Sequence, residues 1–361
     1  MKNFLFAFFL LLSSFGSSQD NDQKIIIITT DGLRWQEVFK GMDSVLAANK
    51  EYNQGDSLNL FKRYWDKSIE GRRQKLLPFF WGTLSKQGQL FGNREYKNKV
   101  DNANPYWFSY PGYSEILTSH VDTLINSNEY PPNPHTTILD FFQSLPNYKG
   151  RVAAFGAWGA FDRILNERRA GFPVINAFDD NIVALKDPTM DLLNEMNQNG
   201  FKPFGNGETL DVFTHYQAFH YLKTKKPKAF FISYGDTDEF AHSGEYKYYL
   251  EAAHQFDQWL SDIWRWIQSD PDYRNKTTIL ITTDHGRGDL NKAQWKSHGK
   301  SVVDSHQMWF ALIGPKVKNI GEIKKEQQIY QKQLAATLAQ LAGFTFTANH
   351  EVSNPVIIEL K

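Results

Sequence analysis

Three apolar runs rich in β-branched residues each end in acidic or imidazole side chains. The runs and the residues that follow them are Ile25–Thr30 with Asp31, Lys228–Ser233 with Asp238 and His242, and Thr277–Thr282 with Asp284 and His285. Continuous apolar runs are typical of strands buried on both faces of a parallel sheet. Ligands of such sheets collect beyond the carboxyl ends of the strands. We therefore expect these polar side chains to converge at one edge of a sheet.

The order of the remaining elements indicates one large α/β domain. Strand patterns alternate with helix patterns along the 361 residues, which predicts a largely parallel central sheet with helices on both faces. We predict further strands at Arg151–Phe155 and Met308–Ile313, and helices at Gln74–Gln87, from Ser114, and at Thr136–Ser144, Glu208–Leu222, Tyr246–Gln268 and Glu326–Leu341. Residues 41–94 carry many aromatic and charged side chains without a motif, so we interpret them as a possible cap over a substrate site.

The residues at the strand ends are a ligand set for divalent ions. Asp238 and His242 are four residues apart, so a helical turn places both on one face. His298 follows in a polar loop, and the chain has no cysteine, which leaves carboxylate, imidazole and hydroxyl groups as ligands. Each motif alone has an ordinary explanation, such as a turn at Asp31-Gly32 or a surface histidine. Together they favour a centre with two ions.

A second element of the sequence carries a candidate nucleophile. In the segment Tyr110–Thr118, Pro111 and Gly112 predict a turn, and a helix pattern begins at Ser114. The simple role of Ser114 is an N-cap. A serine at a helix N-terminus also meets the positive end of the helix dipole, where an anionic phosphoryl group binds well. A metal ion bound to the Ser114 hydroxyl would lower the pKa of that hydroxyl and make Ser114 a nucleophile.

The first residues form an export signal rather than part of the fold. Residues 4–12 are apolar, and small residues precede a cleavage site before Gln19, so residues 1–18 are predicted to be a signal peptide and residues 19–361 the mature domain. The mature protein is expected to be periplasmic or secreted, without a stable membrane anchor. The 40 basic and 40 acidic residues balance, which argues against a nucleic-acid polymer as partner.

The motifs, in this order, resemble the alkaline phosphatase superfamily. Its members include nucleotide pyrophosphatase/phosphodiesterases, alkaline phosphatases, cofactor-independent phosphoglycerate mutases and sulfatases. The similarity extends from Lys24 to about Pro315, where the last predicted strand ends in Gly314-Pro315. It implies the alkaline phosphatase-like fold and two divalent ions, usually zinc. One ion would be held by Asp31, Asp284, His285 and Ser114, and the other by Asp238, His242 and His298.

This resemblance implies an exported hydrolase of small phosphoesters that works through a covalent phosphoserine at Ser114. We favour a phosphodiesterase or nucleotide pyrophosphatase; the alternatives are a phosphomonoesterase, a phosphotransferase or a non-catalytic oxyanion-binding relative. Asp236 competes with Asp238, and His306 with His298, but the family spacing favours Asp238 and His298. Asn126, Asn128 and Arg34 are candidate substrate-binding residues. A sulfatase motif is missing after Ser114, and Ser233 stands where a third ion would need an acid. The oligomeric state is left open.

Overall fold

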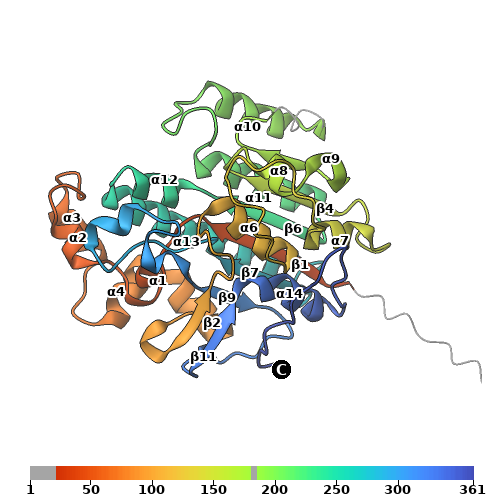
Figure 1. The fold of residues 1–361 in the computed structure, drawn as a ribbon. Coiled ribbons are helices and arrows are strands. Elements are labelled where there is room, and N and C mark those ends of the chain that lie inside the picture. Colours follow the sequence, from red (N-terminus) through yellow and green to blue (C-terminus); the bar gives the residue numbers. More distant parts are fainter. Residues whose placement is uncertain (1–21, 180–184) are drawn as a thin grey trace, which may run out of the picture.

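The computed structural model describes residues 22–179 and 185–361. The predicted signal peptide, residues 1–18, lies outside this range. An eight-stranded sheet crosses the molecule in the order β10-β2-β9-β7-β1-β6-β4-β5 (Figure 1). In that order its strands are Gly321–Glu322, Gly88–Phe91, Phe310–Ile313, Thr277–Thr282, Lys24–Thr30, Ala229–Tyr234, Val152–Gly156 and Val174–Asn176. Strand β9 is antiparallel to both neighbours, and the other pairings are parallel. The prediction of a largely parallel α/β sheet is confirmed.

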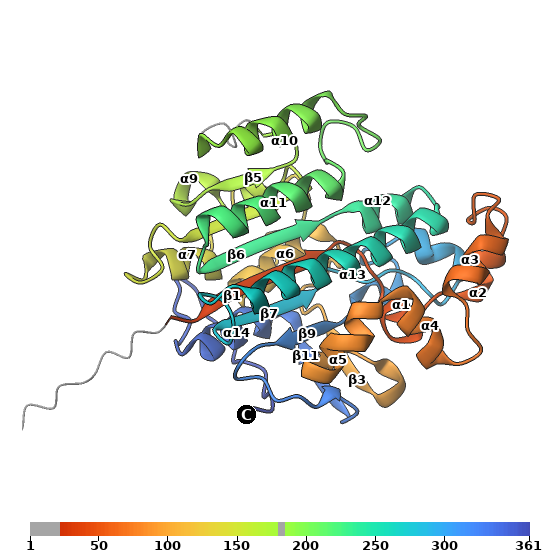
Figure 2. The ribbon, with the colours of Figure 1, turned by 180° about the vertical axis from the view of Figure 1, so that it is seen from behind.

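The alternating side chains of β1 enter two different cores. Ile26 and Ile28 pack on the face covered by α11 (Asp211–Lys225) and α13 (Tyr246–Ser269), which Figure 2 shows in front of the sheet. Ile25 and Ile27 pack on the opposite face, with α6 (Ser109–Thr118), α7 (Ile138–Ser144) and α14 (Leu334–Ala342). Both faces of the central strands are therefore buried, as the unbroken apolar runs predicted.

The shorter elements complete these layers. They are α1 (Trp35–Lys40), α2 (Ser44–Ala48), α3 (Ser57–Tyr64), α4 (Ile69–Leu76), α5 (Ser85–Gln87), α8 (Phe161–Ile164), α9 (Glu167–Ala170), α10 (Pro188–Asn199) and α12 (Asp236–His242). A second sheet has the order β11 (Gln327–Tyr330), β3 (Asn98–Asp101) and β8 (Gln307–Met308). In the part of the chain that the structure describes, no helix is both long and apolar enough to cross a bilayer.

The largest differences from the predicted helix limits are found in three helices. Helix α6 begins at Ser109 rather than Ser114, because Pro111 occupies the first turn, where its missing N–H needs no partner. The predicted helix 74–87 is interrupted, since Pro78 cannot continue α4, and a π-helical turn follows at Phe80–Leu84. The predicted helix 326–341 begins as β11, and α14 starts only at Leu334.

Candidate active site

The order of three neighbouring strands brings the predicted ligands together. Strand β1 lies between β7 and β6 and is parallel to both, so the three carboxyl ends meet at one edge of the sheet. Asp31 follows β1, α12 with Asp238 and His242 follows β6, and Asp284 and His285 follow β7. The expected convergence of these side chains is found in the structure.

The first ligand set consists of Asp31, Asp284 and His285. The Nε2 atom of His285 lies 3.2 Å from Asp31 Oδ1 and 3.4 Å from Asp284 Oδ2. His285 Nδ1 lies 2.9 Å from the Gly286 carbonyl oxygen, so Nδ1 donates and the Nε2 lone pair faces the carboxylates. Asp31 Oδ1 and Asp284 Oδ2 are buried without a hydrogen-bond partner. Because buried acceptors are rarely left unpaired, these atoms fit a bound cation.

The second set consists of Asp238, His242 and His298. His242 Nε2 lies 3.0 Å from Asp238 Oδ2 and 2.9 Å from His298 Nε2. His298 Nε2 is also 3.8 Å from Asp238 Oδ1, and His285 Nε2 is 3.7 Å from the same oxygen. Ligand atoms of Asp238, His285 and His298 all lie within 4.8 Å of one another, as do those of Asp31, Asp284 and His285. His285 therefore lies between two adjacent groups of ligands.

The two competing residues have other partners. His306 places Nδ1 2.7 Å from the Val303 carbonyl oxygen, and its ring packs on Trp107. The Asp236 carboxylate accepts a hydrogen bond from the Asp211 backbone N–H at 3.1 Å. The structure thus brings Asp238 and His298 into the ligand cluster.

Burial and neighbouring charges shift the pKa values of the ligands in different directions. Burial, followed by the charge of Asp238, raises the pKa of Asp31 well above its ordinary value. Burial and then the charge of Asp31 raise the pKa of Asp284. Burial would also raise the pKa of Asp238, but the Arg287 guanidinium and His242 hold it well below the usual range. Burial lowers the pKa of His298, which keeps its imidazole neutral and able to coordinate an ion.

Ser114 does not lie at a helix N-terminus, where the sequence predicted it. Ser114 lies five residues into α6, about 7.5 Å along the helix from its first residue. Its hydroxyl oxygen accepts a hydrogen bond from Asn133 Nδ2 at 3.0 Å. Ser109 instead occupies the first turn, with Oγ 3.4 Å from His285 Nε2. The turn preference of Pro111-Gly112 predicts a helix start after Ser109, whereas proline is also tolerated in the first turn of a helix, a signal that places Ser109 in that turn.

Helix α6 packs directly on the ligand cluster. An added Cβ at Gly112 would lie 2.5 Å from the Asp284 carbonyl oxygen, so only glycine permits this approach. One turn beyond Ser109, the Tyr113 hydroxyl donates to Asp31 Oδ2 at 3.0 Å and accepts from Ser233 Oγ at 3.1 Å. These contacts orient Asp31 and connect the start of α6 to the end of β1.

The three candidate substrate-binding residues have different environments. Asn128 Oδ1 accepts a hydrogen bond from the backbone N–H of Tyr110 at 3.0 Å, which places Asn128 beside the first turn of α6. Asn126 is exposed. The prediction for Arg34 is wrong, because its side chain is fully buried and forms an ion pair with Glu37. Arg34 therefore has no surface to offer a substrate.

Trp107 holds an unusual backbone conformation next to the cluster. Its φ of 56° lies in the left-handed region, which bulky residues rarely adopt. In this conformation its carbonyl oxygen lies 3.3 Å from His298 Nδ1. The contact fixes the His298 ring with Nε2 toward Asp238 and His242. Such strain, about 1–3 kcal/mol, is often found at functional sites.

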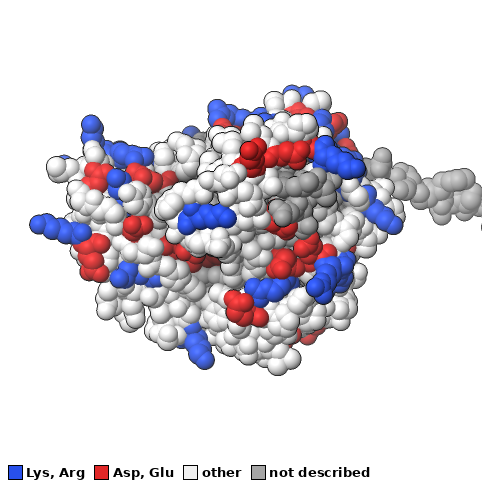
Figure 3. Space-filling model, turned by 90° about the horizontal axis from the view of Figure 1, so that it is seen from above, with Lys and Arg blue, Asp and Glu red and all other residues white. Residues whose placement is uncertain are grey.

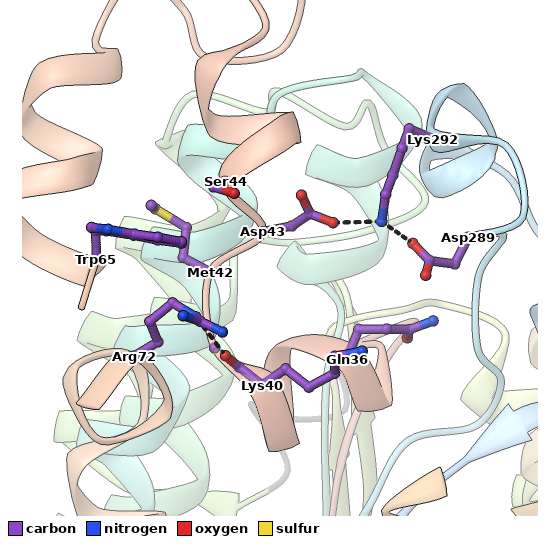
Figure 4. Close-up of a pocket in the computed structure, with 10 residues that line it drawn as sticks. Gln36, Lys40, Met42, Asp43, Ser44, Trp65, Arg72, Asp289 and Lys292 are labelled. Carbon is purple, nitrogen blue, oxygen red and sulfur yellow. Dashed lines mark hydrogen bonds and ion pairs between the residues drawn. The ribbon is translucent and has the colours of Figure 1, made fainter. Parts of the chain in front are cut away.

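A pocket of ≈ 190 Å³ lies between the start of the predicted cap and the loop after His285 (Figure 4). Lys292 crosses one side, with Nζ 2.6 Å from both Asp43 and Asp289. Arg72 donates to the Lys40 carbonyl oxygen at 3.2 Å.

Leucines of α2, α3 and α4 join the same core as α13, and β2 belongs to the central sheet. These parts of residues 41–94 are thus built into the domain, while the interpretation of the segment as a cap stays a prediction.

The strand order and the helices on both faces define an α/β fold, and two ligand sets lie at one edge of its sheet. No protein-family model matches the chain, and no curated protein matches it. Solved structures do: alkaline phosphatase PafA is 10% identical with a TM-score of 0.59, covering 92% of this chain and 98% of that one. Murine ectonucleotide pyrophosphatase/phosphodiesterase 5 is 12% identical with a TM-score of 0.53, covering 92% and 98%. A Vibrio parahaemolyticus protein in the alkaline phosphatase superfamily is 11% identical with a TM-score of 0.51, covering 89% and 66%. The fold is that of the alkaline phosphatase superfamily, as the resemblance implied.

Proposed function

We propose that the chain is a metal-dependent phosphodiesterase in which Ser109, rather than Ser114, forms the covalent phosphoserine. The observation that carries this proposal is the position of Ser109 Oγ, at the N-terminus of α6 and 3.4 Å from His285 Nε2. A helix N-terminus attracts an anionic phosphoryl group. The ligands fit two divalent ions, with zinc favoured by the mixed nitrogen and oxygen donors. Such ions would lower the pKa of the attacking hydroxyl and stabilise the leaving oxygen.

The chain's own residues position the groups that take part in the reaction. Ser109 attacks phosphorus in line: its hydroxyl loses a proton to solvent, its oxygen bonds to phosphorus, and the leaving oxygen separates and takes up a proton to become the alcohol. Tyr113 and the Gly32 backbone N–H hold Asp31 and Asp284 in place, at 3.0 and 3.1 Å. Asn128 lies beside the first turn of α6, where its amide nitrogen could donate to a phosphoryl oxygen. Water then hydrolyses the phosphoserine and restores Ser109.

The buried arginine beside the ligand cluster supports a diester as substrate. Arg287 is paired with Asp238, so it is not free to neutralise the second charge of a phosphate monoester. A diester carries one negative charge and needs less compensation. Basic and acidic side chains are interspersed on the face seen from above (Figure 3), which supports a small molecule over a nucleic-acid polymer.

Hydrolysis of two chromogenic esters tests this proposal. Metal-loaded protein is expected to cleave bis-p-nitrophenyl phosphate faster than p-nitrophenyl phosphate, and EDTA should abolish both activities. Ser109→Ala should lower turnover by about 10⁴-fold, whereas Ser114→Ala, the matched control on the same helix, should leave most activity. Acid quenching followed by peptide mass spectrometry should find phosphate on Ser109. A faster monoester reaction would indicate a phosphomonoesterase, and no turnover of either ester would indicate a binding protein.

We further propose that the protein is exported and processed before Gln19. The apolar segment at residues 4–12 supports this proposal. Amino-terminal sequencing of protein recovered from the periplasm or medium should begin at Gln19. Recovery of the full chain from the cytoplasm alone would contradict it.

A further inference from the structure

Arg287 is a buried cation in direct contact with one of the two ligand sets. Its side chain is 1% exposed, and it follows His285 by two residues. Nη2 donates to the Asp238 backbone carbonyl at 3.0 Å and forms an ion pair with Asp238 Oδ1. Nη1 lies 3.5 Å from the Trp295 carbonyl oxygen. One oxygen of Asp238 is therefore bound by an arginine, while Oδ2 faces His242.

Among the described residues, no lysine or arginine is paired with the carboxylates of the other ligand set, and the charge of Arg287 acts on Asp31 only from a distance. Within residues 22–179 and 185–361, neither Asp31 nor Asp284 forms an ion pair with lysine or arginine. Their hydrogen-bond donors are neutral: the Tyr113 hydroxyl for Asp31 and the Gly32 backbone N–H for Asp284. The first ion would be held by two carboxylates, since a histidine that coordinates an ion adds no negative charge. The second ion would meet one carboxylate whose charge Arg287 already offsets.

We propose that Arg287 makes the two ion sites unequal. The Asp31–Asp284–His285 site fills first and tightly, and the Asp238–His242–His298 site binds its ion more weakly through Asp238 Oδ2. A nearby guanidinium repels a divalent cation and competes for the carboxylate, so it lowers affinity at that site. This inference rests on the proposed two-ion function. It adds that activity follows the occupancy of the second site, and thus the free concentration of the metal ion.

Calorimetric titration of the metal-free full chain with Zn²⁺ tests the proposal. Wild-type protein is expected to bind two ions with dissociation constants at least about 10-fold apart. His242→Ala should remove the weaker event, and Asp284→Asn the tighter one. Arg287→Met should tighten the weaker event by about 10- to 100-fold, while Arg287→Lys, which keeps the charge, should retain the separation. Circular dichroism verifies that each variant is folded.

Arg34→Met is the matched control, because it removes a second fully buried arginine that is paired with an acid outside the ligand sets. It should leave the ratio of the two affinities unchanged. Two ions bound equally by the wild type, or weaker second binding in Arg287→Met, would overturn the role of Arg287 while leaving the proposed hydrolysis intact. If Arg287→Met does not fold, loss of the separation in Arg287→Lys overturns it. Failure of the wild type to bind ions would refute the two-ion site itself.

Discussion

Replacing Gly112 with alanine tests how closely α6 has to approach the strand end that carries Asp284. The added Cβ would lie 2.5 Å from the Asp284 carbonyl oxygen, whereas an ordinary contact needs about 3.4 Å. Helix and strand end therefore have to separate by roughly 0.9 Å. Gln331 resists this movement, because its Nε2 donates to both the Gly112 and the Asp284 carbonyl oxygens, at 2.9 and 3.2 Å.

The expected effect is larger on activity than on stability. Overpacking lowers the unfolding free energy by about 1–3 kcal/mol, and the higher helix propensity of alanine raises it by about 1 kcal/mol. A displacement near 1 Å between Ser109 and the ion ligands can lower turnover by about 100-fold. We expect kcat/KM for bis-p-nitrophenyl phosphate to fall by about 10- to 100-fold, with a net stability loss of about 1 kcal/mol in urea unfolding.

Gly207→Ala is the control for this experiment, since its added Cβ meets no atom within 4 Å. It should leave both activity and unfolding free energy close to those of the wild type. Wild-type activity in Gly112→Ala would refute the argument that the approach of α6 to Asp284 positions the nucleophile.

Three further predictions concern single side chains. His298→Ala should reduce the zinc retained after dialysis from two ions to one and His306→Ala should not; equal retention in both would count against His298 as a ligand. Tyr113→Phe removes the hydrogen bond to Asp31 and should weaken ion binding by about 10- to 100-fold, as measured by competition with a chelator; unchanged affinity would contradict that role. Burial lowers the pKa of His215 to about 3, so the unfolded chain takes up a proton as the pH falls below about 6.5 and the folded chain does not. The unfolding free energy should drop by about 2 kcal/mol between pH 6.5 and pH 5, and less in His215→Gln; equal slopes in urea titrations would refute this.

Much of the site could be predicted because its determinants are local. The runs before Asp31, Asp238 and Asp284 are apolar and β-branched over enough residues to require buried strands. Parallel strands of one sheet end at the same edge, so the polar residues that follow them are expected to lie close together. The spacing in the family that the chain resembles favoured His298 over His306, and the structure places His298 beside His242.

The start of α6 and the pairing of the buried arginines could not be predicted in this way. Pro111 is compatible with a turn and with the first turn of a helix, so the local pattern did not decide between them, and α6 begins five residues before Ser114. Arg34 follows a candidate ligand closely in sequence but turns inward to Glu37.

The sequence alone determined which strands are buried and which polar residues leave their ends, because hydrophobic pattern and residue type are properties of short segments. The tertiary structure decided which hydroxyl meets the ligands and which carboxylate is neutralised by an arginine. Those outcomes depend on distances between segments that only the packed helices and strands bring together.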